Sequence, residues 1–151
     1  TLLPVSSEIF DWKEIQREPI DALISIDHPL AKRKSIDLNE LGGMPFIMFE
    51  EKFALNPIVR NACLKNGFTP KVIARSNQIA FVLELISLGM GVGFLPRMIA
   101  QQRQHSGVKR LKINNNAMEW RMALLWRRNS HLSYAAQAWI DLFGGVNDNK
   151  E

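Results

Sequence analysis

Apolar residues along this chain fall into short runs that are bounded by proline, glycine or polar residues. Runs of this length, rich in branched and aromatic side chains, are typical of β-strands. We predict strands over residues 19–27, 45–49, 71–75, 92–95 and 108–113. A sixth strand is predicted over residues 120–126, where the even positions are apolar and would form one well-packed face.

Between these strands the apolar spacing changes to that of a helix. An amphipathic helix is predicted from the apolar stripe that is formed by Leu55, Ile58, Val59, Ala62 and Cys63. Asn56-Pro57 would open this helix, because asparagine can cap free N–H groups and proline fits the first turn. Gly67 would stop it by taking a left-handed conformation.

Three further helices are predicted towards the C-terminus. The stripe of the first is formed by Ile79, Val82, Leu83 and Ile86, with Ser76 or Asn77 as its cap and Gly89 as its end. Another helix starts at Pro96. Ser133 would cap the last one, whose apolar face is formed by Ala136, Trp139, Ile140 and Phe143. Gly144-Gly145 would stop it, and residues 146–151 would form a frayed tail.

The alternation of strands and helices predicts an α/β architecture, a mixed sheet flanked by helices over residues 19–119. Composition narrows the class of protein further. The chain has 151 residues, of which 46% are hydrophobic and 23% charged, so a disordered chain is excluded. No run reaches the roughly 18–20 apolar residues of a membrane span, and no signal peptide opens the chain. We therefore expect a cytoplasmic protein without membrane contact.

No pattern predicts catalysis, a metal site or a cofactor. Cys63 lies in a helical apolar stripe and is expected to be a buried, inert thiol. The three histidines lack the spacing of metal ligands. Glu50-Glu51 are expected to be solvated, and no nucleophile, base and oxyanion donor come together. The chain is therefore not expected to be an enzyme.

The glycines at positions 89, 91 and 93 do not predict a nucleotide-binding loop. Such a loop follows a strand and opens a helix, whereas here the order is helix, glycines, strand. The basic groups at residues 32–34, 109–112 and 127–128 are expected to be solvated rather than to contact nucleic acid, because no helix-turn-helix pattern accompanies them. The net charge of +4 permits an acidic partner without requiring one.

Two predicted strand ends point to ligand binding. Open α/β sheets bind ligands beyond the carboxyl ends of their strands, and helix N-termini offer N–H donors. Residues 49–56 and 75–77 each join a predicted strand end to a predicted helix start. The alternative is that Asn56 and Ser76 only cap their own helices, and the spacing alone leaves both interpretations open.

Several motifs, taken in order, resemble the effector-binding domain of LysR-type transcriptional regulators. The first are His28-Pro29-Leu30-Ala31, Leu38 to Leu41 before Pro45-Phe46-Ile47, and Gly67-Phe68-Thr69-Pro70. The most specific is the segment from Leu88 to Pro96, LGMGVGFLP. The last are Trp126-Arg127-Arg128, Leu132 to Ala136, and Trp139-Ile140. The match covers roughly residues 19–143.

This resemblance implies a two-lobe fold like that of type 2 periplasmic binding proteins, with one lobe incomplete. Residues 19–119 would form lobe II, and residues 1–18 the late part of lobe I and the crossover. Residues 120–143 would return to lobe I as a strand and a C-terminal helix, with residues 144–151 as a tail. The first half of lobe I, the winged helix-turn-helix and its linker would precede Thr1.

The resemblance also implies a function. A small-molecule inducer would bind between the lobes and change how the full-length oligomer binds DNA. The N-terminal domain, which would precede Thr1, would make the only contact with DNA. The effector site is expected at Phe49, Glu50, Ser76, Asn77 and Phe94. Glu50-Glu51 argue against an anionic effector. The last helix would cover its apolar face with a second copy of the chain. Alternatives are an extracytoplasmic solute-binding protein, or an enzyme on the same two-lobe fold.

Overall fold

The computed structural model describes residues 1–143 and divides the chain into two compact units. Unit 2 is Glu18–Glu119, and unit 1 combines Thr1–Arg17 with the segment that begins at Trp120. The predicted helix stop at residues 144–145 and the predicted tail at 146–151 lie outside the described residues. Within residues 1–143, no helix has both the length and the apolar character that a membrane span requires.

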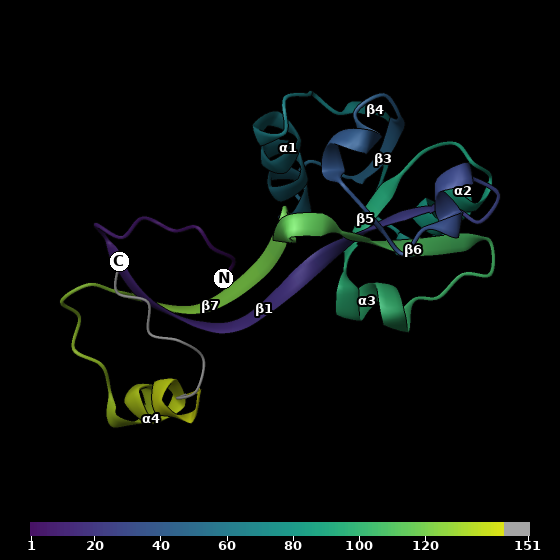
Figure 1. The fold of residues 1–151 in the computed structure, drawn as a ribbon. Coiled ribbons are helices and arrows are strands. Elements are labelled where there is room, and N and C mark those ends of the chain that lie inside the picture. Colours follow the sequence, from purple (N-terminus) through teal and green to yellow (C-terminus); the bar gives the residue numbers. More distant parts are fainter. Residues whose placement is uncertain (144–151) are drawn as a thin grey trace. The chain divides into compact units, whose positions relative to one another are not determined.

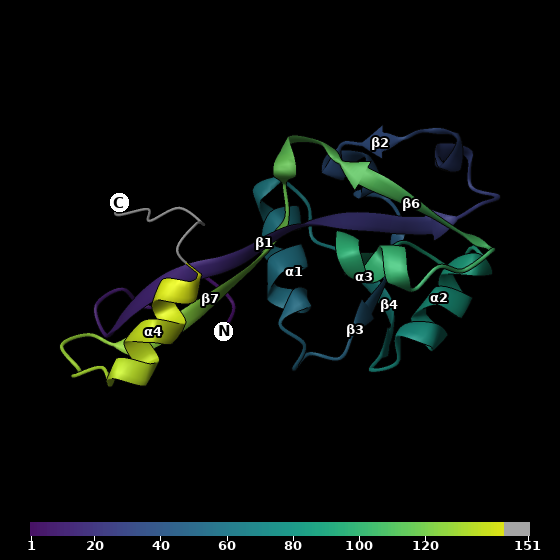
Figure 2. The same cartoon turned by 90° about the horizontal axis from the view of Figure 1, so that it is seen from below.

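Unit 2 is built on a mixed sheet whose central strand is β1 (Phe10–Ser25), a long strand that enters from unit 1 (Figure 1). β1 pairs antiparallel with β5 (Gly93–Pro96) and with β6 (Val108–Ile113). Figure 2 shows β6 alongside the second half of β1. The short β2 (Ser35–Ile36) joins β6 in parallel. The mixed α/β sheet predicted from the sequence is thus confirmed.

The boundaries predicted for the first strand are wrong at both ends. β1 begins at Phe10 rather than residue 19 and ends at Ser25 rather than residue 27. The start is hidden in the sequence because residues 13–18 are mostly polar, which obscures the apolar pattern. At the other end the Ser25 hydroxyl accepts a hydrogen bond from the Asp27 amide at 3.3 Å, so the chain turns before residue 27.

A second, parallel pair in unit 2 joins β3 (Pro45–Phe49) to β4 (Lys71–Ser76). Val92, just before β5, bridges to Phe46 in parallel. Its amide donates to the Pro45 carbonyl at 2.9 Å, and the Ile47 amide donates to the Val92 carbonyl at 2.8 Å. The strand predicted at residues 92–95 is therefore a bridging residue followed by β5, one residue later than expected.

Helices follow the strands as the sequence predicts. α1 (Leu55–Lys65) comes after β3, α2 (Ile79–Ser87) after β4, and α3 (Arg97–Gln102) directly after β5. Short 3-10 helices occupy Pro29–Lys32, Leu38–Leu41 and Asn114–Asn116. The predicted stripes of α1 and α2 are buried except for Ile58 and Ile79, which are half-buried. The largest fully buried side chains of the sheet include Phe46, Ile20, Ile24, Ile47 and Leu111.

The glycine motif is a helix stop followed by close backbone approaches, as predicted. Gly89 has φ +73°, a left-handed conformation that ends α2 without a side-chain clash. A Cβ on Gly91 would lie 2.5 Å from the Pro45 carbonyl oxygen. A Cβ on Gly93 would lie 2.5 Å from Cδ1 of Ile86. These two glycines allow the bridge at Val92 to pack against β3 and α2.

The glycine stops predicted at Gly67 and Gly89 both have the expected positive φ, but the predicted N-terminal caps are correct only for the last helix. α1 begins one residue before Asn56, with Ala54 as its N-cap, so Asn56 does not cap it. α2 has Gln78 as its N-cap, so neither Ser76 nor Asn77 caps it. The expected capping side chains make other hydrogen bonds, since Asn56 donates to the Glu50 carbonyl and Ser76 accepts from the Gln78 amide.

A buried ion-pair cluster joins three elements of unit 2. Asp21 of β1 is fully buried. Arg97 of α3 forms two hydrogen bonds with its carboxylate, at 2.9 and 3.0 Å, and Arg110 of β6 forms a third at 2.5 Å. The carboxylate raises the pKa of Arg97 and keeps both guanidinium groups in place. This cluster fixes α3 and β6 on the central strand.

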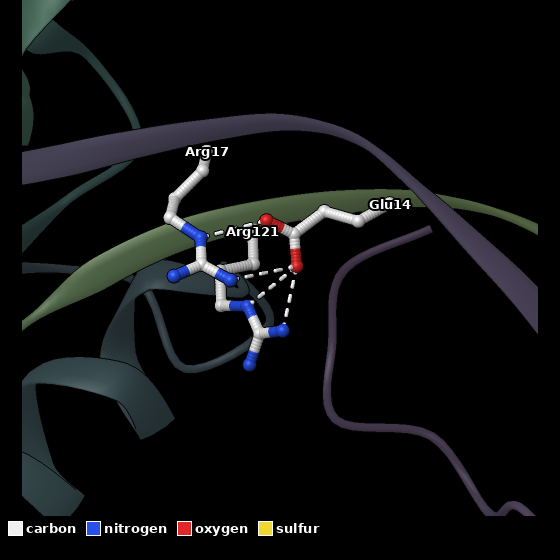
Figure 3. A network of polar contacts seen from close by, with 3 residues as sticks. All are labelled: Glu14, Arg17 and Arg121. Atoms are coloured by element: carbon white, nitrogen blue, oxygen red, sulfur yellow. Dashed lines mark hydrogen bonds and ion pairs between the residues drawn. The ribbon is translucent and has the colours of Figure 1, made fainter. Parts of the chain in front are cut away.

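Unit 1 contains the first half of β1, β7 (Glu119–Arg127), which pairs with β1, and α4 (Tyr134–Leu142). Its β1 half is held by Glu14, whose carboxylate accepts hydrogen bonds from Arg17 and from Arg121 of β7 (Figure 3). The Arg121 bonds measure 2.8 and 2.6 Å, and the Arg17 Nε bond 2.7 Å. These hydrogen bonds outweigh the burial of Glu14 and lower the pKa of its carboxyl.

The apolar faces predicted in unit 1 are only partly covered. Among the described residues of this unit, Leu3 and Ala123 are the buried apolar side chains. The even positions of β7 are half-buried rather than well packed, which corrects the prediction for residues 120–126. Ser133 caps α4 as predicted, accepting from the Ala136 amide at 3.2 Å. No α4 residue is buried, and Trp139 is 62% exposed.

Candidate functional site

The five predicted effector residues all lie in unit 2, at or near the carboxyl end of the β3–β4 pair. Phe49 lies opposite Ser76 in the parallel register. The following residues, Glu50 and Asn77, are therefore also brought to this edge of the pair. We call Phe49, Glu50, Ser76 and Asn77 the strand-end cluster.

The residues of the strand-end cluster differ in exposure. Glu50 and Asn77 are exposed and Ser76 is half-buried, so three polar groups can reach a ligand. Phe49 is only 4% exposed, and its ring stacks on Phe53 at 5.2 Å between centroids. The aromatic ring is therefore largely buried, and the three polar residues are the accessible part of the strand-end cluster.

Phe94 is placed differently from the other four residues. It lies in β5 opposite Ala22, is 3% exposed and packs against Phe46 at 5.2 Å between ring centroids. With Phe49 it lines a small internal cavity of about 10 Å³. Phe94 is therefore a core residue near the strand-end cluster, and it shares this cavity rather than the exposed edge.

The turn before α2 leaves hydrogen-bond donors at the strand-end cluster. The Ser76 hydroxyl accepts from the Gln78 amide at 3.1 Å, which closes the turn between β4 and α2. Within the described part of the chain, no side chain caps the N-terminus of α2. The first amides of a nine-residue helix are thus oriented beside Ser76 and Asn77. Such amides favour an acceptor oxygen or an anion.

Asn56 holds the other half of the strand-end cluster, a role that the sequence did not reveal. Its Nδ2 donates to the carbonyl of Phe49 at 2.9 Å and to that of Glu50 at 2.6 Å. The Asn56 side chain thereby fixes the backbone at the end of β3. Arg75 adds a longer bond of 3.4 Å from Nη1 to the Phe49 carbonyl. Asparagine before proline is compatible with a cap or with such an anchor, so the sequence could not distinguish the two.

A groove between α1 and β4 was also not predicted. It has a volume of about 550 Å³ and is lined by Met48, Glu51, Asn56, Pro57, Arg60, Thr69, Pro70, Val72 and Arg75. We call it the α1–β4 groove. Its size falls in the range of small-molecule sites, and its lining mixes apolar side chains with two arginines and one glutamate.

Chemically, the unit offers binding groups and no activated nucleophile. Cys63 of α1 is buried, and burial raises the pKa of its thiol to about 11, so it is protonated at neutral pH. In residues 1–143, no group of three or more histidine, cysteine or acidic side chains is placed to hold a metal ion. The strand-end cluster provides hydrogen-bond donors and acceptors next to a largely buried phenylalanine.

Comparisons of the chain with family models and with known proteins agree on one family. The LysR substrate binding domain family matches residues 1–147. The uncharacterized HTH-type transcriptional regulator YwbI of Bacillus subtilis is 34% identical over 140 residues, which are 93% of this chain and 46% of that protein. The chain thus spans less than half the length of this relative.

Solved structures share the fold. The effector binding domain of QuiR in complex with shikimate has a TM-score of 0.74 at 22% identity, covering 93% of this chain and 66% of that one. The regulatory domain of Synechocystis PCC6803 CcmR in complex with 2-PG has a TM-score of 0.76 at 21% identity, covering 99% and 73%. At this level of identity the likeness establishes the type 2 periplasmic-binding-protein-like fold.

Proposed function

Because the chain belongs to the LysR substrate binding domain family, we propose that it is the ligand-sensing part of a bacterial transcription regulator. The effector is a small organic molecule. The relatives named above support this class, since they are transcriptional regulators or regulatory domains, two of them with a small molecule bound. The same relatives favour it over a solute-binding protein for uptake and over an enzyme.

Within this function, unit 2 corresponds to lobe II, predicted at residues 19–119. Residues 1–18 and 120–143 contribute the late part of lobe I, its return strand and its last helix. The strand-end cluster supplies lobe II's share of the effector site, with Ser76, Asn77 and the α2 amides as polar contacts and Phe49 as the apolar one. Phe94 supports Phe49 from the core side.

The polar groups define what the effector must carry. The uncapped α2 amides and the hydroxyl of Ser76 favour a ligand with acceptor oxygens. Glu50 is exposed beside them and accepts hydrogen bonds from hydroxyl groups on the same ligand. A molecule with several oxygens and a flat apolar part satisfies both sets of contacts.

The longer regulator reads DNA through a winged helix-turn-helix outside this chain and works as a cytoplasmic oligomer. Effector binding changes the equilibrium between two arrangements of the lobes only by the difference in its affinity for them. Asn56 fixes the backbone at Phe49-Glu50 by two hydrogen bonds. The strand-end cluster therefore keeps the same shape in both arrangements of the lobes.

The observation that carries this proposal is the register that places Phe49 opposite Ser76 beside the α2 N-terminus. We would test it with the full-length regulator, screening small oxygen-rich molecules, including shikimate, for binding by calorimetry. Ser76→Ala is expected to weaken binding by about tenfold, because one ligand hydrogen bond is lost. Ser106→Ala, a change at an exposed serine outside the cluster, is the matched control.

If Ser76→Ala lowers thermal stability and leaves effector affinity unchanged, Ser76 serves only to close the turn before α2. The site assignment then fails. A regulator whose stretch before this chain encodes no winged helix-turn-helix would contradict the proposed class itself.

A further inference from the structure

The turn between β3 and α1 carries an exposed aromatic ring, that of Phe53. Phe53 is 41% exposed, whereas Phe49 at the end of β3 is almost fully buried. The two rings are stacked, with 5.2 Å between their centroids and 26° between their planes. Phe49 therefore offers a ligand little surface of its own, and the accessible part of this aromatic pair is the Phe53 ring.

Hydrogen bonds at both ends fix the turn that carries Phe53. The Phe53 amide donates to the Glu50 carbonyl at 2.9 Å, and the Phe53 carbonyl accepts from the Asn56 amide at 3.0 Å. Nδ2 of Asn56 also holds the carbonyls of Phe49 and Glu50. A ring on a backbone that is already ordered loses little conformational freedom when a ligand binds to it, which favours binding.

The register of the β3–β4 pair places the Phe53 ring on the same side as Ser76. Register partners on neighbouring strands share a face, so Phe49 and Ser76 lie on one face of the pair. The preceding partners, Met48 and Arg75, lie on the opposite face, and both line the α1–β4 groove. Phe53 stacks on Phe49 and is not part of the lining of that groove. It therefore lies on the face of Ser76.

We infer that Phe53 is the residue that selects a planar ring in the effector. This inference rests on the proposed effector site and adds the ring-binding surface to it. The flat face of the effector ring stacks on Phe53, while the oxygens of the effector bind at Ser76 and the α2 amides. Stacked aromatic pairs contribute more than the area that they bury, and a puckered saturated ring cannot form such a stack.

The probes are 4-hydroxybenzoate and 4-hydroxycyclohexanecarboxylate, which carry the same polar groups on a planar and on a puckered ring. Calorimetry measures the affinity of each for the full-length regulator. We expect the planar compound to bind about threefold to tenfold more tightly. Phe53→Leu is expected to bring this ratio close to one, because leucine keeps an apolar side chain and removes the flat face. Phe53→Tyr keeps the ring and is expected to keep the ratio.

Two further variants separate this inference from the proposed function. Leu64→Ala is the matched control, since Leu64 is an exposed apolar residue at the far end of α1, and it should change neither affinity. Ser76→Ala should weaken both compounds to the same extent and so leave their ratio unchanged. Circular dichroism verifies that each variant is folded.

Two results would overturn the inference and leave the proposed function in place. One is an unchanged ratio in Phe53→Leu while Ser76→Ala weakens both compounds, since Phe53 would then only cover Phe49. The other is an equal loss of the ratio in Phe53→Leu and Leu64→Ala. If neither compound binds to the parent regulator, the proposed class of effector is wrong and the inference fails with it.

Discussion

Several side chains in this protein contribute by forming hydrogen bonds that fix the backbone near the strand-end cluster. Asn56 is the clearest case, since its Nδ2 joins two carbonyls at the end of β3 instead of capping α1. Both roles use the same residue type at the same place in the sequence, so the pattern cannot separate them. The sequence could place Phe49 and Ser76 at neighbouring strand ends, but it could not show which side chains fix that edge.

Glu14 gives a pH-dependent prediction. Hydrogen bonds from Arg17 and Arg121 lower the pKa of the folded carboxyl below its ordinary value of 4.5. The unfolded chain therefore binds the proton first as pH falls, so the stabilisation by Glu14 is complete above about pH 4.5 and is lost as pH falls through the lowered pKa. We expect unit 1 to become less stable over that range.

The measurement is urea unfolding of the chain followed by tryptophan fluorescence, because Trp12, Trp120, Trp126 and Trp139 are all in unit 1. Glu14→Gln is expected to cost about 1–3 kcal/mol at pH 7 and much less once the pH has fallen through the lowered pKa of Glu14. Glu8→Gln is the control. A difference between Glu14→Gln and the parent chain that does not shrink in acid would contradict the assignment.

Helices and strands lie where the sequence predicts them when one of their faces is buried. The predictions fail where paired polar side chains occupy a strand. α1, α2 and β3 match their predicted positions because their apolar stripes are buried in unit 2. The first half of β1 was missed because Glu14 occupies a buried position where a strand pattern would show an apolar residue. β7 was found, but its even face is less covered than its pattern suggested.

The bridge at Val92 depends on the absence of a side chain at Gly91. Gly91→Ala would place a Cβ 2.5 Å from the Pro45 carbonyl oxygen, a backbone atom that cannot move aside on its own. We expect a loss of about 1–3 kcal/mol in the free energy of unfolding of unit 2. Circular dichroism during urea unfolding measures it.

Gly43→Ala is the matched substitution, since nothing lies within 4 Å of its added Cβ and its φ is not positive. It should remain within about 0.5 kcal/mol of the parent chain. Equal effects at both glycines would show that the close approach at Gly91 is not what limits substitution there.

At the scale of the whole molecule, the chain is divided at Arg17 and Glu119 into two units that differ in how many apolar side chains they bury. Unit 2 has a continuous core, whereas unit 1 buries few apolar side chains in its described part. The correspondence of these units with lobes II and I remains a prediction, based on ordered motifs and not on periodicity. Periodicity describes single elements, and it carries no information on which elements pack together.

The exposed face of α4 leads to a prediction about association. Trp139 and Leu142 are 62% and 79% exposed, and covering such side chains contributes about 1.5–3 kcal/mol each. We expect the isolated chain to self-associate through α4 in light-scattering measurements. Leu142→Ser should weaken this association, and Leu88→Ser, at an equally exposed leucine of unit 2, should not. A strictly monomeric chain with quencher-accessible Trp139 would refute the prediction.

We propose that a small molecule at the strand-end cluster controls DNA binding by the longer regulator. The most direct measurement is the affinity of that regulator for its operator, followed by fluorescence anisotropy with and without an inducer. For the parent protein and Ser106→Ala we predict that the inducer changes operator affinity by at least about fivefold, a coupling of roughly 1 kcal/mol. At an inducer concentration near the Kd of the parent protein, Ser76→Ala should lose most of that change, because its inducer site is then mostly empty. An inducer effect of the same size in Ser76→Ala at that concentration would contradict the proposed site.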